Sequence, residues 1–270
     1  MASDAADGDE ILHRIDSGVS WITLNRPEAM NAVNRDQRER IIALLAGASA
    51  DPDVRAVVLT ATGKGFCAGA DLRGAPAAPA TERVAGDVAR MIRLGAQRLI
   101  TAVLDCEKPV IAAVNGTAAG IGAHLALACD LVIAAEGARF IEVFVRRGLV
   151  PDGGGAYLLP RLLGPQKAKE LMFFGDAVAA DEAARLGLVN KVVAAEELEA
   201  AARSWAERLA QGPTRALALT KQLVNASLDG DRATALAAEA AAQELNMSTA
   251  DAHEGVAGFV ERRTPKYRGR

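Results

Sequence analysis

Short apolar runs separated by turn residues make up the first two thirds of the chain. Between them, apolar residues three and four positions apart predict helices at 35–48 and 84–104. The expected strands are 11–15, 19–24, 54–61, 110–114, 131–134 and 188–193. Nearly continuous apolar strands that alternate with helices are typical of an α/β protein whose sheet is covered on both faces.

The pattern changes at Glu196, where Ala, Glu, Leu and Arg recur at helical spacing. Breaks at Gly212-Pro213 and Asp229-Gly230 predict three or four helices there. Alanine-rich faces such as 233–242 commonly serve as core or as a subunit contact. We therefore expect a disordered tail over 1–10, an α/β core over 11–195 and a helical region over 196–270.

Composition narrows the class of protein further. Half of the 270 residues are apolar and the formal net charge is −3, with no basic stripe that would favour nucleic acid. Residues 1–10 lack the features of a signal peptide, and His124 and Asp130 interrupt the longest apolar run at 118–135. We expect a cytoplasmic protein that neither enters nor binds a membrane.

The sequence shows neither a metal-binding motif nor a complete dinucleotide-binding motif. Three cysteines and three histidines match no zinc or disulfide framework, so no metal site is expected. Gly120-x-Gly122 resembles half of a dinucleotide fingerprint, but Leu125 stands where its third glycine would be, so we expect no nicotinamide cofactor.

Glycine and other turn residues cluster in three loops beside predicted strands, at 62–65, 115–122 and 151–155. Such loops can direct backbone N–H groups and a helix N-terminus at one point, which suits an oxyanion. The alternative is that these glycines only permit tight packing between strand and helix.

Five segments then carry a family resemblance. They are 24–32 (Leu-Asn-Arg-Pro and Ala-Met-Asn-Ala), 66–72 (Phe-Cys-Ala-Gly-Ala-Asp-Leu), 108–116 (Lys-Pro-Val-Ile-Ala-Ala-Val-Asn-Gly), 129–131 (Cys-Asp-Leu) and 259–267. In this order, over 11–267, they resemble the crotonase (enoyl-CoA hydratase/isomerase) superfamily.

The resemblance implies a spiral of ββα units, a C-terminal helical trimerisation region, and trimers that often pair into hexamers. It implies an acyl-CoA substrate with no separate cofactor, and an oxyanion hole formed by the backbone N–H groups of Ala70 and Ile121. Coenzyme A would be held by Ala29, Met30, Ala68, Ala70, Asp71, Leu72 and Arg73, with Lys266 and Tyr267 reaching a neighbouring subunit's nucleotide.

The chain departs from the family's hydratases at two catalytic positions. Where those enzymes carry two glutamates, this sequence has His124 and Phe144. Phe144 cannot transfer a proton, which places the usual hydration route in doubt. Glu142, two positions away, is a candidate displaced base. His124 lies near a predicted helix N-terminus, whose dipole favours a neutral imidazole able to relay a proton, or it only hydrogen-bonds within the pocket.

Asp152, in Leu149-Val-Pro-Asp-Gly153, is the remaining acid-base candidate. Family isomerases use an aspartate in this loop, and the segment resembles the ring-epoxide isomerase branch. Asp152 is expected to move a proton between carbons of an unsaturated acyl thioester, or to cap the following helix. We therefore expect an isomerase; the alternatives are an enoyl-CoA hydratase of fatty-acid oxidation with a displaced base, and a non-catalytic acyl-CoA binding paralogue.

Overall fold

A six-stranded sheet runs through the computed structural model, which describes residues 9–73 and 84–270. Its strand order is β1-β2-β3-β5-β7-β10, and only the β1–β2 pair is antiparallel. The strands are β1 (Ile11–Asp16), β2 (Val19–Leu24), β3 (Ala56–Ala61), β5 (Val110–Val114), β7 (Leu131–Ala135) and β10 (Lys191–Val193).

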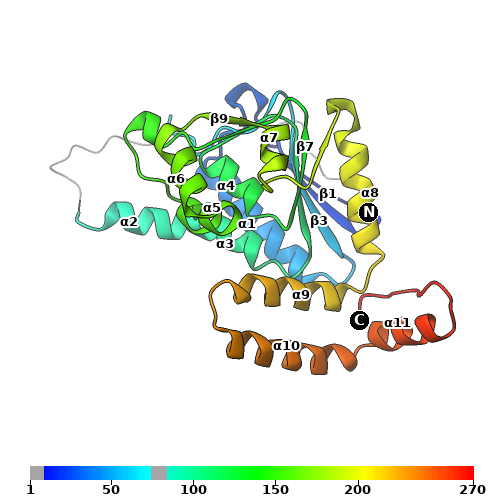
Figure 1. Cartoon of the computed structure of the whole chain (residues 1–270). Coiled ribbons are helices and arrows are strands. Elements are labelled where there is room, and N and C mark those ends of the chain that lie inside the picture. The colour runs from blue at the N-terminus through cyan, green and yellow to red at the C-terminus, as the bar shows by residue number, and fades with distance from the viewer. Residues whose placement is uncertain (1–8, 74–83) are drawn as a thin grey trace.

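Both faces of this sheet are buried, which explains why its strands are apolar at successive positions. In β3, Val57 and Leu59 belong to one apolar cluster, whereas Ala56 and Val58 belong to another. The second cluster lies under α8 (Leu198–Ala210). The first lies under α1 (Arg35–Ala50), α3 (Arg98–Leu104) and α4 (Ile121–Leu127), so helices flank the sheet on two sides (Figure 1). The predicted α/β class is confirmed.

A second, smaller sheet has the order β4-β6-β8-β9. Its strands are β4 (Gly65–Cys67), β6 (Thr117–Ala119), β8 (Arg139–Ile141) and β9 (Ala177–Ala179). Three times the chain leaves a strand of the large sheet, adds a strand to the small one and continues into a helix. This is the ββα spiral that the resemblance implied. The units begin at unequal intervals, which is why no sequence period marks them.

The helix predicted at 84–104 is wrong at its start and interrupted within. Gly86 has φ +91°, and α2 (Asp87–Ile92) begins only after it. A π-helical turn, Arg93–Gln97, then joins α2 to α3. Its Ala96 would lie 3.4 Å from a Cβ placed on Gly153, so this irregular turn borders the 151–155 loop.

Two predicted strands also begin too early. Val54 belongs to a turn, since its N–H donates to Asp51 O at 3.3 Å, and β3 starts at Ala56. Leu188 donates to Ala183 O at 2.8 Å at the end of α7 (Ala180–Arg185), and β10 starts at Lys191, where pairing with β7 begins. In both cases, apolar residues that precede the strand but lie outside the sheet made the predicted strand too long.

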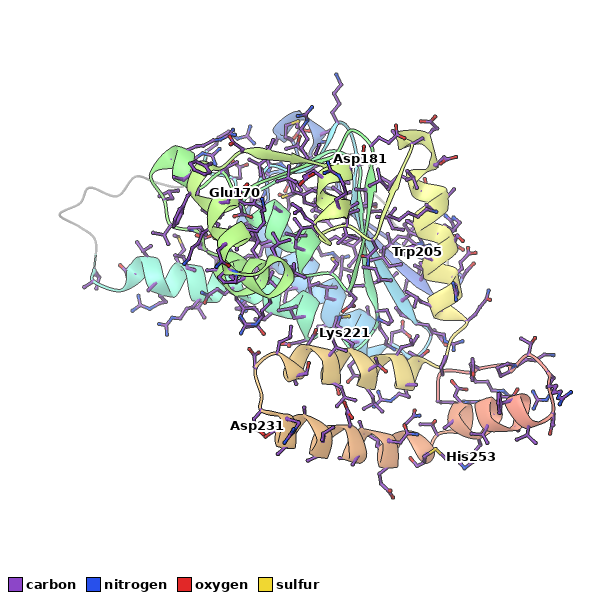
Figure 2. All side chains as sticks on the ribbon, viewed as in Figure 1. Glu170, Asp181, Trp205, Lys221, Asp231 and His253 are labelled. Atoms are coloured by element: carbon purple, nitrogen blue, oxygen red, sulfur yellow. The ribbon has the colours of Figure 1, made fainter. Side chains whose placement is uncertain are left out.

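The C-terminal region continues from α8 into three further helices, α9 (Thr214–Ser227), α10 (Arg232–Met247) and α11 (Ala250–Val260). Lys221 joins α9 to the core, because its Nζ lies 2.9 Å from Asp130 Oδ2 and donates to Val103 O at 3.0 Å (Figure 2). The α10 and α11 helices lie beyond α9, away from the sheets (Figure 1). The prediction of three or four helices is confirmed.

Within the described ranges, every helix is too short or too polar to cross a bilayer. Most of the predicted tail, residues 1–8, lies outside those ranges. Glu10 is held in place, since its carbonyl accepts a 2.9 Å hydrogen bond from the Asn25 N–H and its carboxylate a 2.7 Å bond from Asn34.

Candidate functional site

Two loops that are distant in sequence join beside the small sheet. Ala68 N–H donates to Met30 O at 2.9 Å, and Val33 N–H donates to Gly69 O at 2.8 Å. Asp71 N–H returns a bond to Val33 O at 3.0 Å. These three bonds place the expected coenzyme A residues Ala29 and Met30 next to the 68–73 segment.

Buried Asn31 and its neighbour Arg26 hold these loops in register. Asn31 has φ +54°, and its side-chain amide donates to Thr62 O at 2.8 Å and to Gly65 O at 2.7 Å. The Arg26 guanidinium lies 2.9 Å from Asp71 Oδ2. Hydrogen bonds from Arg73 and from Arg26 hold the pKa of Asp71 well below its usual range. Both organising residues lie in the motif that carried the resemblance, but their role in the loops was not anticipated.

The loops that carry Ala70 and Ile121 meet at very short range. A Cβ on Gly69 would lie 3.0 Å from Ala119 O and 3.8 Å from Ile121 N, and one on Gly122 would overlap the Cys67 carbonyl. Neither the Ala70 nor the Ile121 N–H has a hydrogen-bond acceptor in 9–73 or 84–270. Two free N–H groups on adjacent loops suit a developing negative charge.

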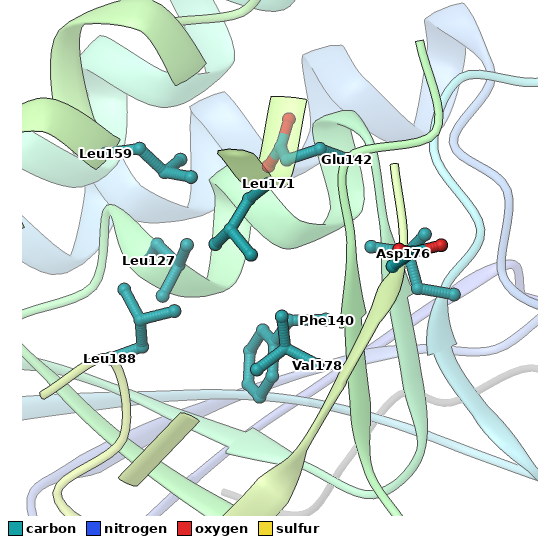
Figure 3. A pocket seen from close by; sticks show the side chains of 9 residues that line it. Leu127, Phe140, Glu142, Leu159, Leu171, Asp176, Val178 and Leu188 are labelled. Carbon is teal, nitrogen blue, oxygen red and sulfur yellow. The ribbon is translucent and has the colours of Figure 1, made fainter. Parts of the chain in front are cut away.

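His124 is fully buried on α4 and contacts both Glu142 and Phe144. Its Nε2 lies 3.2 Å and 3.0 Å from the two carboxylate oxygens of Glu142. Phe144 stacks on the imidazole, with ring centroids 5.4 Å apart. Glu142 also lines a small pocket with Asp176 and several apolar side chains (Figure 3). The sequence singled out each of these residues but not the His124–Glu142 pair.

Asp152 lies where the 151–155 loop passes over His124. A Cβ on Gly153 would lie 3.3 Å from the Ile121 side chain and 3.7 Å from His124 Nδ1, and one on Gly155 would overlap the imidazole. Only glycines allow this close approach. Within the described residues, Asp152 Oδ1 and His124 Nδ1 are buried without a hydrogen-bond partner, which costs roughly 1–3 kcal/mol for such an atom.

The capping interpretation of Asp152 is wrong. The helix after the loop, α5 (Gly155–Leu163), has Gly154 as its N-cap residue and no side-chain cap hydrogen bond. The next helix, α6 (Pro165–Phe174), follows directly. Burial raises the pKa of Asp152 above its usual value, and an electrostatic contribution from nearby His124 partly opposes that rise. A carboxyl group with a raised pKa and a free oxygen has the properties of a proton-transfer group.

Lys266 and Tyr267 do not join these residues within one chain. The Tyr267 carbonyl accepts a bond from Arg55, at the start of β3, whereas the site loops follow the other end of that strand. The Tyr267 ring packs on Gly255 of α11. Contact with a neighbouring subunit's coenzyme A therefore stays a prediction.

The buried thiols contribute no nucleophile. Burial raises the pKa of Cys67 to about 11 and also raises that of Cys129. Thiolates are the reactive form, so both side chains act as small apolar groups.

The spiral of ββα units thus brings the loops that carry Ala70 and Ile121 together, beside the half-buried Asp152 in the 151–155 loop. The family model described as enoyl-CoA hydratase/isomerase matches residues 14–270. The chain belongs to the enoyl-CoA hydratase/isomerase family.

Among the individual relatives, some are named hydratases and one is named an isomerase. A Rhodobacter capsulatus protein named probable enoyl-CoA hydratase is 42% identical over 96% of this chain and 98% of its own. The 1,2-epoxyphenylacetyl-CoA isomerase of Escherichia coli is 38% identical, with the same two coverages. The crystal structure of enoyl-CoA hydratase from Bacillus anthracis is 34% identical and superposes with a TM-score of 0.88, covering 97% of this chain and 100% of that one.

Proposed function

We propose that the protein isomerises an unsaturated acyl-CoA thioester by proton transfer through Asp152. The observation that carries this proposal is the pairing of a buried, unpartnered Asp152 carboxyl oxygen with Phe144 at a hydratase glutamate position. The site thus keeps one acid-base group at Asp152, whereas the Phe144 side chain cannot move a proton. The similarity to a 1,2-epoxyphenylacetyl-CoA isomerase supports the same choice.

The reaction follows from these groups. Asp152 takes a proton from C2 of a 3-enoyl thioester, and the electrons of the C2–H bond form a C1–C2 double bond while the carbonyl π electrons move onto the thioester oxygen, which gives a dienolate. When C4 is later protonated, the carbonyl re-forms, the C1–C2 pair becomes the C2–C3 double bond, and the C3–C4 π pair takes the proton. The negative charge on the thioester oxygen in the enolate is held by the N–H groups of Ala70 and Ile121, each worth roughly 10²–10³ in rate. Asp152 then returns a proton to C4. We propose that this reaction needs no metal and no nicotinamide.

Hydration is the second candidate, because several relatives bear hydratase names. It would require Glu142 or His124 to activate water. These two groups already bind each other at 3.0 Å and are buried, so they are poorly placed to take a proton from water in the substrate site. A binding protein without activity is the third candidate.

Turnover of a small panel separates the three. We expect 3-hexenoyl-CoA to be converted to 2-hexenoyl-CoA faster than crotonyl-CoA is hydrated, with both reactions followed by chromatography of the thioesters. Faster hydration would support the hydratase. Tight binding of both thioesters without any product would support the binding protein.

We also propose a trimeric or hexameric assembly through the C-terminal helices. Within the described residues, α10 buries no residue in the monomer, and the apolar side chains of Leu236, Leu245, Phe259 and Val260 are more than half exposed. Apolar surface of this kind needs a partner. Light scattering at micromolar concentration should give the mass of three or six chains, and the mass of one chain would contradict the assembly.

A further inference from the structure

The 151–155 loop brings Asp152 close to His124, and each of these residues has one buried polar atom without a hydrogen-bond partner in the described residues. His124 Nδ1 lies next to Gly153, and Gly153 follows Asp152, whose Oδ1 is the other atom. Both atoms are buried, so bulk water does not separate them. Since no hydrogen bond joins this nitrogen and this carboxyl oxygen, a proton can pass between them through one bridging water molecule.

Glu142 determines which imidazole nitrogen takes part. A carboxylate only accepts hydrogen bonds, so Nε2 carries the hydrogen that Glu142 accepts at 3.0 Å. In the neutral ring, Nδ1 then has its lone pair directed at the Asp152 loop. When Nδ1 takes up a proton, the resulting imidazolium is already paired with the Glu142 carboxylate.

Glu142 also lines a small cavity whose wall includes a carboxylate that is exposed to solvent. The pocket in Figure 3 is a cavity of about 10 Å³, close to the smallest volume that admits one water molecule. Buried Glu142 and exposed Asp176 both line it, and the rest of its lining is apolar. The only acidic groups along this cavity are therefore one buried carboxylate and one carboxylate in contact with solvent.

We propose that Asp152, His124 and Glu142 form a relay that exchanges the substrate-derived proton with solvent, with Glu142 and His124 as positioning residues that act through Asp152. The proposal rests on the function proposed above. After the C2–H bond breaks, the proton on Asp152 passes to His124 Nδ1, and Nε2 releases a proton towards Glu142 and the cavity. A solvent proton returns by the reverse path, and Asp152 delivers it to C4. Without the relay, the C2 proton itself is delivered to C4.

Isotope transfer tests the relay. With 3-hexenoyl-CoA deuterated at C2, in ordinary water, the wild-type product should contain little deuterium at C4 by mass spectrometry. Glu142→Gln preserves the shape and can still accept from Nε2, but it removes the charge that stabilises the imidazolium. His124→Gln preserves a donor to Glu142 but cannot carry a proton. Both variants should retain most of the deuterium at C4, with kcat lowered about 10–100-fold and KM unchanged.

Glu170→Gln, at an exposed position on α6, is the matched control and should behave as the wild type. A purely structural role for the pair would lower kcat without changing deuterium retention. High retention of deuterium at C4 in the wild-type product would overturn the relay. Loss of deuterium from C4 to the same extent in the wild type and in both variants would also overturn it.

A second measurement separates the relay from the proposed function. Wild-type protein should exchange the C2 protons of saturated hexanoyl-CoA with D₂O, and Glu142→Gln and His124→Gln should exchange them more slowly. If the protein does not isomerise 3-hexenoyl-CoA but exchanges the C2 protons of hexanoyl-CoA at a rate that depends on Glu142, the relay is supported and the isomerase is rejected. Equal exchange rates in wild type and variants, or none in any of them, would reject the relay.

Discussion

Asp152→Asn should lower the turnover of 3-hexenoyl-CoA by about 10²–10⁴-fold, the range typical of general acid–base catalysis. Asparagine preserves the size of the side chain but cannot take a proton. Because Asp152 Oδ1 has no hydrogen-bond partner in the described residues and asparagine keeps an acceptor oxygen, the change should disturb the fold little, and the affinity for the thioester should scarcely change. Steady-state kinetics and calorimetric titration with a saturated acyl-CoA measure the two quantities.

The matched control is Asp181→Asn, an exposed aspartate on α7, which should leave turnover unchanged. Full activity of Asp152→Asn, together with rapid hydration of crotonyl-CoA, would contradict the isomerase and leave His124 or Glu142 as the base. Unchanged binding with no turnover in any form would favour the binding protein.

The kcat/KM of the same reaction should fall at acidic pH. Asp152 accepts a proton only as a carboxylate, and burial raises its pKa above the usual 3.8, an effect that nearby His124 partly opposes. As the pH falls through that raised value, Asp152 becomes protonated and kcat/KM should fall. The residual activity of Asp152→Asn should lack this acidic limb. A limb at or below the ordinary carboxyl value would contradict the raised pKa.

Gly122→Ala should damage the site and the fold together. The new Cβ would overlap the carbonyl oxygen of Cys67 and lie 2.7 Å from its Cβ, and both atoms are fixed in the core. The loops would have to separate, at a cost of about 1–3 kcal/mol of stability. Because Ile121 adjoins Gly122, the separation would move its N–H away from that of Ala70, and kcat should fall about 10²–10³-fold.

Gly47→Ala is the control for this change. Gly47 lies in α1, and no atom comes within 4 Å of the place that an alanine Cβ would take. Alanine should therefore stabilise the protein by about 0.5–1 kcal/mol and leave kcat unchanged. Urea unfolding and steady-state kinetics measure both variants. Wild-type kcat in Gly122→Ala would show that the close approach of the loops does not position the Ile121 N–H.

The sequence by itself determined the large sheet and the catalytic departure from the hydratases. The β5 strand is readable because burial on both faces leaves an uninterrupted apolar run. The absence of both glutamates is visible at His124 and Phe144, and Asp152 is visible as the acid-base residue left in its loop. These are properties of residue type and order, which neighbouring residues do not alter.

Only the tertiary structure decided the small sheet and the arrangement of the acid-base groups. The strands of that sheet have three residues each, too few to show a period, and their pairing comes from the turns of the spiral. His124 and Glu142 lie 18 residues apart on different elements, and Asp152 reaches them because Gly153 and Gly155 let the backbone pass against the imidazole. Such contacts depend on how separate elements pack. A local sequence pattern contains no information on the distance between residues of different elements.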